Sequence, residues 1–210
     1  MKTYLTVGSQ AAHEITINKS RFIGLAFSIE DESDIALCLD RARVEYPAAT
    51  HYCYGAVIGQ DGLIQRFSDD GEPGGTAGMP ILQVLVQKEL RNVLVVVVRY
   101  FGGIKLGAGS LVRAYTQSAV EVIDKAGIVR MVPGSRGLLT LGYTQLGSVE
   151  YLLRQWGIGI EDIAYSDKVS IRVTTDMPWD ELCGRIRDAC SGNVQIIRLD
   201  DIYLAKHPGP

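Results

Sequence analysis

The sequence contains a run of six consecutive apolar residues, Val93–Val98, that constrains the fold more than any other feature. The run has the length of a strand and is far below the roughly 18 residues that a membrane-spanning helix needs. It is apolar on both faces, which predicts a β-strand in the centre of a sheet. Two glycine-rich loops that carry charges, Ser68–Gly78 and Arg99–Gly109, flank this strand and the helix expected before it.

The two glycine-rich loops are costly to order, because glycine loses more conformational freedom on folding than any other residue. Two such loops close together in the sequence predict one shaped surface where the backbone approaches something closely. The alternative interpretation is two tight turns that bind no ligand.

The composition narrows the classes of function. The chain has 210 residues, of which 47% are apolar and 21% charged, and its net charge is −3. This length suits one large or two small domains. The acidic balance argues against generic binding to duplex DNA, because contact with a phosphate backbone needs a strongly basic face.

The chain lacks the sequence features of membrane and secreted proteins. No apolar run is long enough to cross a bilayer, and the first ten residues lack the apolar core of a signal peptide. The four cysteines show neither C-x-x-C spacing nor a dense framework, so we expect them to be small buried hydrophobes. We therefore expect a cytoplasmic protein with no membrane partner.

Hydrophobic periodicity and turn residues predict an α+β domain over residues 1–131. Strands are expected at Thr3–Ile17, Arg21–Ile29, His51–Ile58, Leu63–Phe67 and Val93–Val98. Helices are expected between Asp31 and Tyr46, from Thr76 as the cap of a short helix, and from Gly109 to Ala126.

A second domain is expected over residues 136–206, after a linker near 132–135 that reads Val-Pro-Gly-Ser. Its expected elements are a strand at Gly137–Tyr143, a helix at Thr144–Trp156, a hairpin of Ile158–Tyr165 and Lys168–Thr174, a helix at Pro178–Cys190 and a strand at Val194–Leu204. This β-α-β-β-α-β order predicts a ferredoxin-like fold.

Three carboxylates, those of Asp69, Asp70 and Glu72, lie within four residues of the first loop. Carboxylates this close could bind a hard cation such as Mg²⁺, although the spacing of a calcium loop is absent. In the alternative interpretation, one carboxylate caps a turn and another pairs with an arginine. We expect neither a metal nor a cofactor.

The second loop carries Arg99 and Lys105, and Arg113 follows in the expected helix. Backbone amides at a helix N-terminus attract anions, so a phosphate or an acidic side chain could bind there. The loop matches neither the P-loop nor the dinucleotide-binding fingerprint. The alternative is an internal salt bridge between this basic loop and the acidic loop.

Two further pairs have both a functional and a packing interpretation. His51 and Cys53 share one face of an expected strand and could supply two zinc ligands, or a nucleophile with its base. No further ligand or orienting group is evident, which favours a packed strand face. Tyr100 and Phe101 could stack on nucleic-acid bases, but packing under the second loop is favoured. No catalytic motif stands out, so the sequence favours a non-enzymatic protein.

Several segments together carry a resemblance to a known family. They are Ser20–Ile23, Ala49–His51, Phe67–Pro73, Gly75–Gly78 and Arg99–Gly107. In order and spacing these segments resemble the YigZ/IMPACT family over residues 20–127, and the C-terminal segment is similar to the extra domain of bacterial members. The resemblance implies an N-terminal two-layer domain like the second domain of ribosomal protein S5, with helices on one face of a mixed sheet. With the ferredoxin-like domain, it resembles the last two domains of elongation factor G.

The resemblance also implies a role near translation, because eukaryotic members of the family regulate translation under nutrient stress. The expected function is a non-enzymatic regulatory or binding protein whose partner is the ribosome, RNA or a translation-associated protein. The alternative is an enzyme or binder of a phosphate-containing small molecule held by both loops. The expected surface comprises Asp69, Asp70, Glu72, Gly75, Thr76, Arg99, Tyr100, Gly102, Gly103, Lys105 and Arg113, with His51 as a secondary member.

Overall fold

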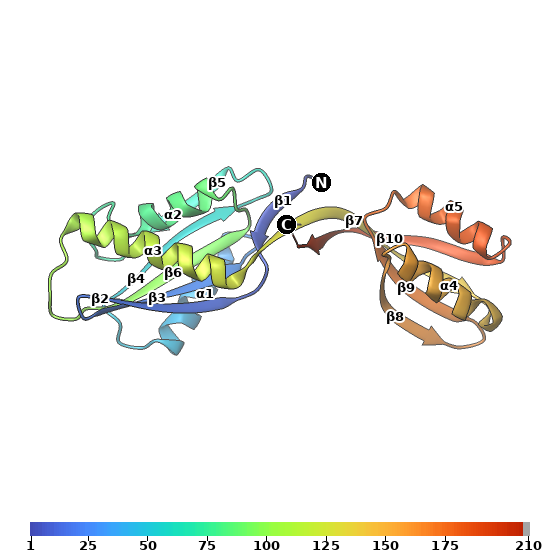
Figure 1. Cartoon of the computed structure of the whole chain (residues 1–210), viewed down its shortest axis with the longest axis horizontal. Helices are drawn as coiled ribbons and strands as arrows, with labels where there is room; N and C mark the ends of the chain where they lie inside the picture. Colours follow the sequence, from blue (N-terminus) through green and yellow to red (C-terminus); the bar gives the residue numbers. More distant parts are fainter. Residues whose placement is uncertain (208–210) are drawn as a thin grey trace. The chain divides into compact units, whose positions relative to one another are not determined.

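The computed structural model describes residues 1–207 and divides into two compact units, which we describe separately (Figure 1). The larger unit comprises residues 3–130, and the smaller unit comprises residues 1–2 and 131–206. Each unit combines helices with a β-sheet, which confirms the predicted two-domain α+β class.

The larger unit is built on a five-stranded sheet. Its strand order is β2 (Ala11–Ile17), β3 (Ser20–Ser28), β6 (Val93–Tyr100), β4 (His51–Ile58) and β5 (Ile64–Ser68). Neighbouring strands in this order run antiparallel. The apolar run 93–98 lies in β6, the central strand, and each of its side chains is fully buried, as the run predicted.

Helices cover both faces of this sheet. On one face, α2 (Gly78–Gln87) and α3 (Ala108–Ala126) pack over Val95 and Val97 of β6. On the other face, α1 (Ser33–Glu45) packs over Leu94 and Val96. This arrangement differs from helices on one face of a mixed sheet, because a strand that is apolar on both faces needs apolar cover on both.

The N-terminal segment forms two strands where the sequence predicted one. β1 (Tyr4–Val7) pairs with β7 (Ile128–Leu141), whereas β2 pairs with β3. The chain turns between β1 and β2 at residues 8–10, where the Gly8 amide donates to the Gly127 carbonyl at 2.9 Å. The alternating pattern predicted extended backbone but did not specify which strand each half would pair with.

The smaller unit has a four-stranded core in the order β10-β7-β9-β8, in which β9 runs antiparallel to both β7 and β8, and this is the ferredoxin-like order. Its remaining elements are α4 (Tyr143–Gln155), β8 (Gly159–Tyr165), β9 (Val169–Thr175), α5 (Trp179–Ala189) and β10 (Val194–Lys206). Both helices pack on one apolar cluster, in which Leu153 and Leu182 contact buried side chains of β7 and β9.

Residues 132–135, where the sequence predicted a linker, lie inside β7, which passes from one unit into the other. Proline lacks a backbone N–H and is therefore confined to the unpaired or edge parts of strands. Pro133 meets this condition with respect to β9, because the pairing of β7 with β9 begins at Ser135.

Gly55 of β4 lies against α2 with no room for a side chain. A Cβ atom at this position would lie 2.6 Å from the backbone nitrogen of Leu82 and 2.8 Å from its Cα. We expect Gly55→Ala to lower the free energy of unfolding of the larger unit by about 1–3 kcal/mol, because α2 must move away from the sheet. Hydrogen exchange of the β4 and α2 amides measures this change. The matched control is Gly74→Ala, whose Cβ would meet nothing within 4 Å; equal effects of the two changes would contradict the close packing.

Candidate functional site

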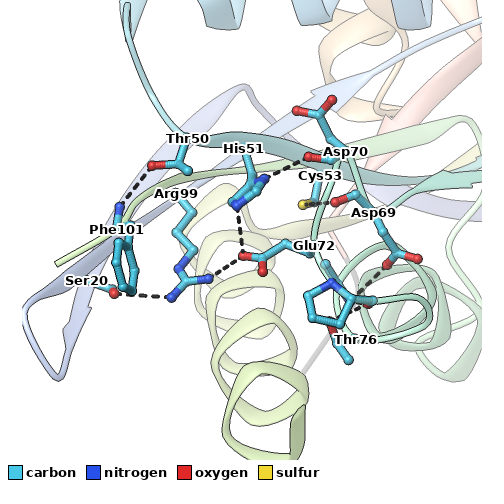
Figure 2. A network of polar contacts seen from close by, with 12 residues as sticks. Ser20, Thr50, His51, Cys53, Asp69, Asp70, Glu72, Thr76, Arg99 and Phe101 are labelled. Atoms are coloured by element: carbon cyan, nitrogen blue, oxygen red, sulfur yellow. Dashed lines mark hydrogen bonds and ion pairs between the residues drawn. The ribbon is translucent and has the colours of Figure 1, made fainter. Parts of the chain in front are cut away.

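Asp69 organises the first glycine-rich loop. Its carboxylate accepts hydrogen bonds from three backbone amides, those of Gly75 (2.8 Å), Ala77 (3.0 Å) and Gly78 (2.8 Å). It thereby satisfies amides that lead into α2, which begins at Gly78. The sequence predicted Thr76 as the cap of this helix, and that prediction is wrong: the Thr76 hydroxyl donates to the Pro73 carbonyl at 2.7 Å (Figure 2).

Asp70 connects the same loop to β4. Its carboxylate accepts the Tyr52 amide at 2.6 Å, and its carbonyl oxygen lies 2.7 Å from Nδ1 of His51. A carbonyl only accepts, so Nδ1 of His51 carries a proton and donates it. Nε2 of His51 then faces the Glu72 carboxylate at 3.8 Å (Figure 2).

Glu72 and Arg99 form a buried ion pair that joins the two loops. Nη1 of Arg99 donates to Oε1 of Glu72 at 2.5 Å, and the Tyr115 hydroxyl donates to the same oxygen at 2.8 Å. Nη2 of Arg99 donates to the Ser20 hydroxyl at 3.3 Å. All four residues are buried, so the internal salt bridge that the sequence left as an alternative is present at the base of the site.

The Arg99 guanidinium also contacts two aromatic rings. Its carbon lies 5.2 Å from the centroid of Phe22 and 5.5 Å from that of Phe101. These distances allow a cation–π attraction to each ring. Arg99 is therefore held by its ion pair, by hydrogen bonds and by packing. Its side chain is buried and is used inside the protein.

Cys53 and Tyr115 lie beside this ion pair and are both held protonated. The Cys53 thiol donates to the Asp69 carbonyl at 3.0 Å and lies 3.4 Å from the Tyr115 hydroxyl. Burial raises the pKa of Cys53 to about 12, the nearby Glu72 carboxylate adds to the rise, and the hydrogen bond with Tyr115 opposes it. Burial, followed by the Cys53 and Glu72 contacts, raises the pKa of Tyr115. Neither group is poised as a nucleophile at neutral pH.

In the second loop, the backbone of Gly102 packs closely against another segment of the same protein. A Cβ atom on Gly102 would lie 2.1 Å from the Lys19 carbonyl carbon and 2.5 Å from the Ser20 amide nitrogen. The Gly102 amide also donates to the Ser20 hydroxyl at 3.2 Å. This glycine is therefore accounted for by internal packing against the turn between β2 and β3.

The far side of the second loop is exposed. The Lys105 side chain has no hydrogen bond or ion pair with any residue of the described range 1–207. Arg113 contacts Ser110 one turn earlier in α3 at 3.1 Å, and Phe101 and Ile104 are both exposed. This region, residues 101–113, presents cationic and apolar groups together, and we call it the second-loop surface.

The structure separates the predicted site residues into two groups. Asp69, Asp70, Glu72, Gly75, Thr76, Arg99 and His51 lie together in or against the first loop, whereas Gly103, Lys105 and Arg113 lie on the second-loop surface. Tyr100 is fixed apart from both, with its hydroxyl donating to the Pro47 carbonyl at 3.0 Å. The sequence did not indicate Ser20 and Tyr115 as polar members of the site. Tyr115 is buried among apolar side chains, and only its hydroxyl reaches Glu72.

Neither a metal-ligand cluster nor a membrane-spanning helix is found within residues 1–207. No group of three or more His, Cys, Asp or Glu side chains in this range is placed to hold a metal ion. Within the same residues, each helix is too short or too polar to span a membrane.

The Glu72–Arg99 pair is open to a double-mutant cycle. We expect Glu72→Gln and Arg99→Met each to lower the free energy of unfolding by about 3–5 kcal/mol, because each leaves a buried charge without its partner. The loss of unfolding free energy in the double variant should be smaller than the sum of the losses in the two single variants. Urea unfolding of the full chain measures the unfolding free energy of all three variants. Arg21→Met, which breaks an exposed pair with Glu14, is the control and should have little effect. Additive losses would mean that Glu72 and Arg99 do not stabilise each other.

The raised pKa of Cys53 predicts slow alkylation in the folded protein. A rise from 9.0 to about 12 lowers the thiolate fraction at pH 8 by about a thousandfold, and the thiolate is the reactive form. We expect iodoacetamide to modify Cys53 last among the four cysteines, which are all buried. Peptide mass spectrometry over time measures each site, and the urea-unfolded protein provides the reference rates. Fast native labelling of Cys53 would contradict its burial beside Asp69 and Tyr115.

Comparisons with known proteins identify the family. Residues 18–123 match the Impact N-terminal domain, and residues 139–193 match a domain of unknown function, DUF1949. The chain is 40% identical to IMPACT family member YvyE of Bacillus subtilis over 80% of this chain and 78% of that protein, and 32% identical to IMPACT family member YigZ of Escherichia coli over 96% and 100%. A crystal structure described as that of a hypothetical protein superposes with a TM-score of 0.63 at 32% identity, covering 95% of this chain and 98% of the other. The chain therefore belongs to the IMPACT family.

Proposed function

We propose that this protein is a non-enzymatic regulator of translation that binds the ribosome, RNA or a translation-associated protein in the cytoplasm. The proposal extends to this chain the role in translation that the family resemblance implies. The observation that carries it is the division of the charged residues, in which the carboxylates are used internally while Lys105 is left exposed. A cation without an internal partner beside exposed apolar side chains is suited to a partner with acidic or phosphate groups.

The proposed partner-binding surface includes fewer residues than the surface expected from the sequence. Asp69 accepts three backbone amides, Asp70 accepts the Tyr52 amide, and Glu72 pairs with Arg99, so these groups hold the loop in shape. The contact surface is then the second-loop surface, which carries the exposed Phe101 and Ile104 as well as Lys105 and Arg113.

The small-molecule alternative requires carboxylates that are free to hold a metal–phosphate complex. In the folded loop each of the three carboxylates already accepts hydrogen bonds, and the Arg99 side chain is buried against Glu72. Binding of such a complex would have to break several of these contacts, which favours the non-enzymatic role. A thermal-shift panel of nucleotides with Mg²⁺ separates the two functions: a rise in melting temperature with one of them would favour the alternative.

The second-loop surface is tested by co-sedimentation with purified bacterial ribosomes and with total RNA, at two salt concentrations. We expect the full chain to co-sediment at low salt, and Lys105→Ala to bind several-fold more weakly, because it removes an unpaired cation from the contact. If Lys105 meets a phosphate, the same change should reduce the salt slope by about one.

The matched control is Lys168→Ala, which removes an exposed lysine from the smaller unit. It should bind as the unaltered protein does. Absence of co-sedimentation of the unaltered chain with ribosomes and RNA would remove the support for a ribosomal or RNA partner, and equal losses for both lysine variants would show that the second-loop surface has no special role.

A further inference from the structure

A groove of about 910 Å³ lies on the face of the larger unit that α1 covers. Its walls are α1, the segment Ser28–Asp31 that leads into this helix, and Gln10 before β2. The two glycine-rich loops contribute no residue to its lining, so this groove is separate from the site described above.

Apolar side chains on α1 remain uncovered along this groove. Leu37 is 63% exposed and Val44 is 83% exposed. They are seven residues apart, so they lie on the same side of the helix, two turns from each other. The buried Ile29 and Cys38 also line the groove, which makes its apolar surface continuous with the core of this face. Exposed apolar surface of this kind marks sites of protein interaction.

The rim of the groove is acidic. Five carboxylates line it, from Glu30, Asp31, Asp34, Asp40 and Glu45, together with the guanidinium of Arg41. Asp31 and Asp34 accept backbone amides at the start of α1, and Asp40 pairs with Arg43 at 3.0 Å, so the acidity toward a partner comes chiefly from Glu30 and Glu45. Arg41 is exposed, but its guanidinium is engaged within the unit, because Nη2 donates to the Gln10 side-chain oxygen at 3.2 Å and the guanidinium lies 5.7 Å from the ring centroid of Phe27. The Glu30 carboxylate has no hydrogen bond or ion pair within residues 1–207, so it is available to an incoming cation.

We propose that the α1 groove docks a basic amphipathic helical segment of a partner protein. Its apolar side chains would cover Leu37 and Val44, and its lysines or arginines would face Glu30 and Glu45. Charge selects this occupant over others. A second copy of the chain, docked through the same groove, would bring two acidic rims together, and a nucleic acid would bring phosphates to carboxylates. Helix-in-groove recognition supplies the required geometry, with apolar contacts three, four and seven residues apart.

A random library of 16-residue peptides, selected against the full chain, provides the probe. We expect the enriched peptides to place apolar residues at helical spacing and lysine or arginine on the flanks. Fluorescence anisotropy with the most enriched peptide then gives its Kd for each variant. Leu37→Ser with Val44→Ser should raise the Kd at least tenfold, and Glu30→Gln with Glu45→Gln should raise it at least threefold and weaken its dependence on salt.

The matched control is Leu63→Ser, which changes a leucine that is 80% exposed and lies outside the groove. It should leave the Kd unchanged, and hydrogen exchange of α1 should show that each variant is folded. No enrichment from the library, enrichment of acidic peptides, or an equal Kd for the groove and control variants would overturn the proposal. If analytical ultracentrifugation finds that the unaltered chain is a dimer, and that Leu37→Ser with Val44→Ser dissociates it, the groove would be assigned to a second copy of the chain instead.

Discussion

The buried ion pair of Glu72 and Arg99 is the contact on which the arrangement of the site depends. It joins the first loop to the end of the central strand, and Tyr115 of α3 donates to the same carboxylate. A buried charge that loses its partner is strongly destabilising. The pair therefore requires β6, α3 and the loop 68–78 to be positioned together, and it explains why residues distant in the sequence form one compact centre.

The conformation of the two glycine-rich loops is related to this buried ion pair. Asp69 and Asp70 use their carboxylates on amides of the neighbouring chain, so the acidic loop is held by its own charges. The second loop is held at its start, where the Phe101 amide donates to the Thr50 hydroxyl at 3.1 Å and the Gly102 amide donates to the Ser20 hydroxyl at 3.2 Å, and near its end, where Leu106 packs against the core. Between these points Lys105 is exposed and takes no part in the internal network of residues 1–207. The same pair of loops thus has one part whose charges maintain structure and one part whose cation, Lys105, is exposed.

The sequence predicted the elements well and their partners less well. The apolar run of β6 located the central strand because burial on both faces leaves a direct pattern in the residues. The pairing of β1 with β7, and the continuation of β7 through residues 132–135, depend on contacts between distant segments that periodicity does not encode. In the site, charge pattern suggested that the loops pair with each other. It did not show which carboxylate would take Arg99, nor that Asp69 rather than Thr76 would hold the start of α2.

The position of Gly102 has a consequence for how the family's sequence motifs are interpreted. Any side chain there would collide with the backbone of Lys19 and Ser20, whatever the protein binds. Natural selection would therefore keep glycine at this position in relatives that have exchanged one partner for another. The glycine-containing motif reports that the fold has been inherited, whereas divergence of activity should be sought at neighbouring exposed positions such as Lys105, which folding leaves free to vary.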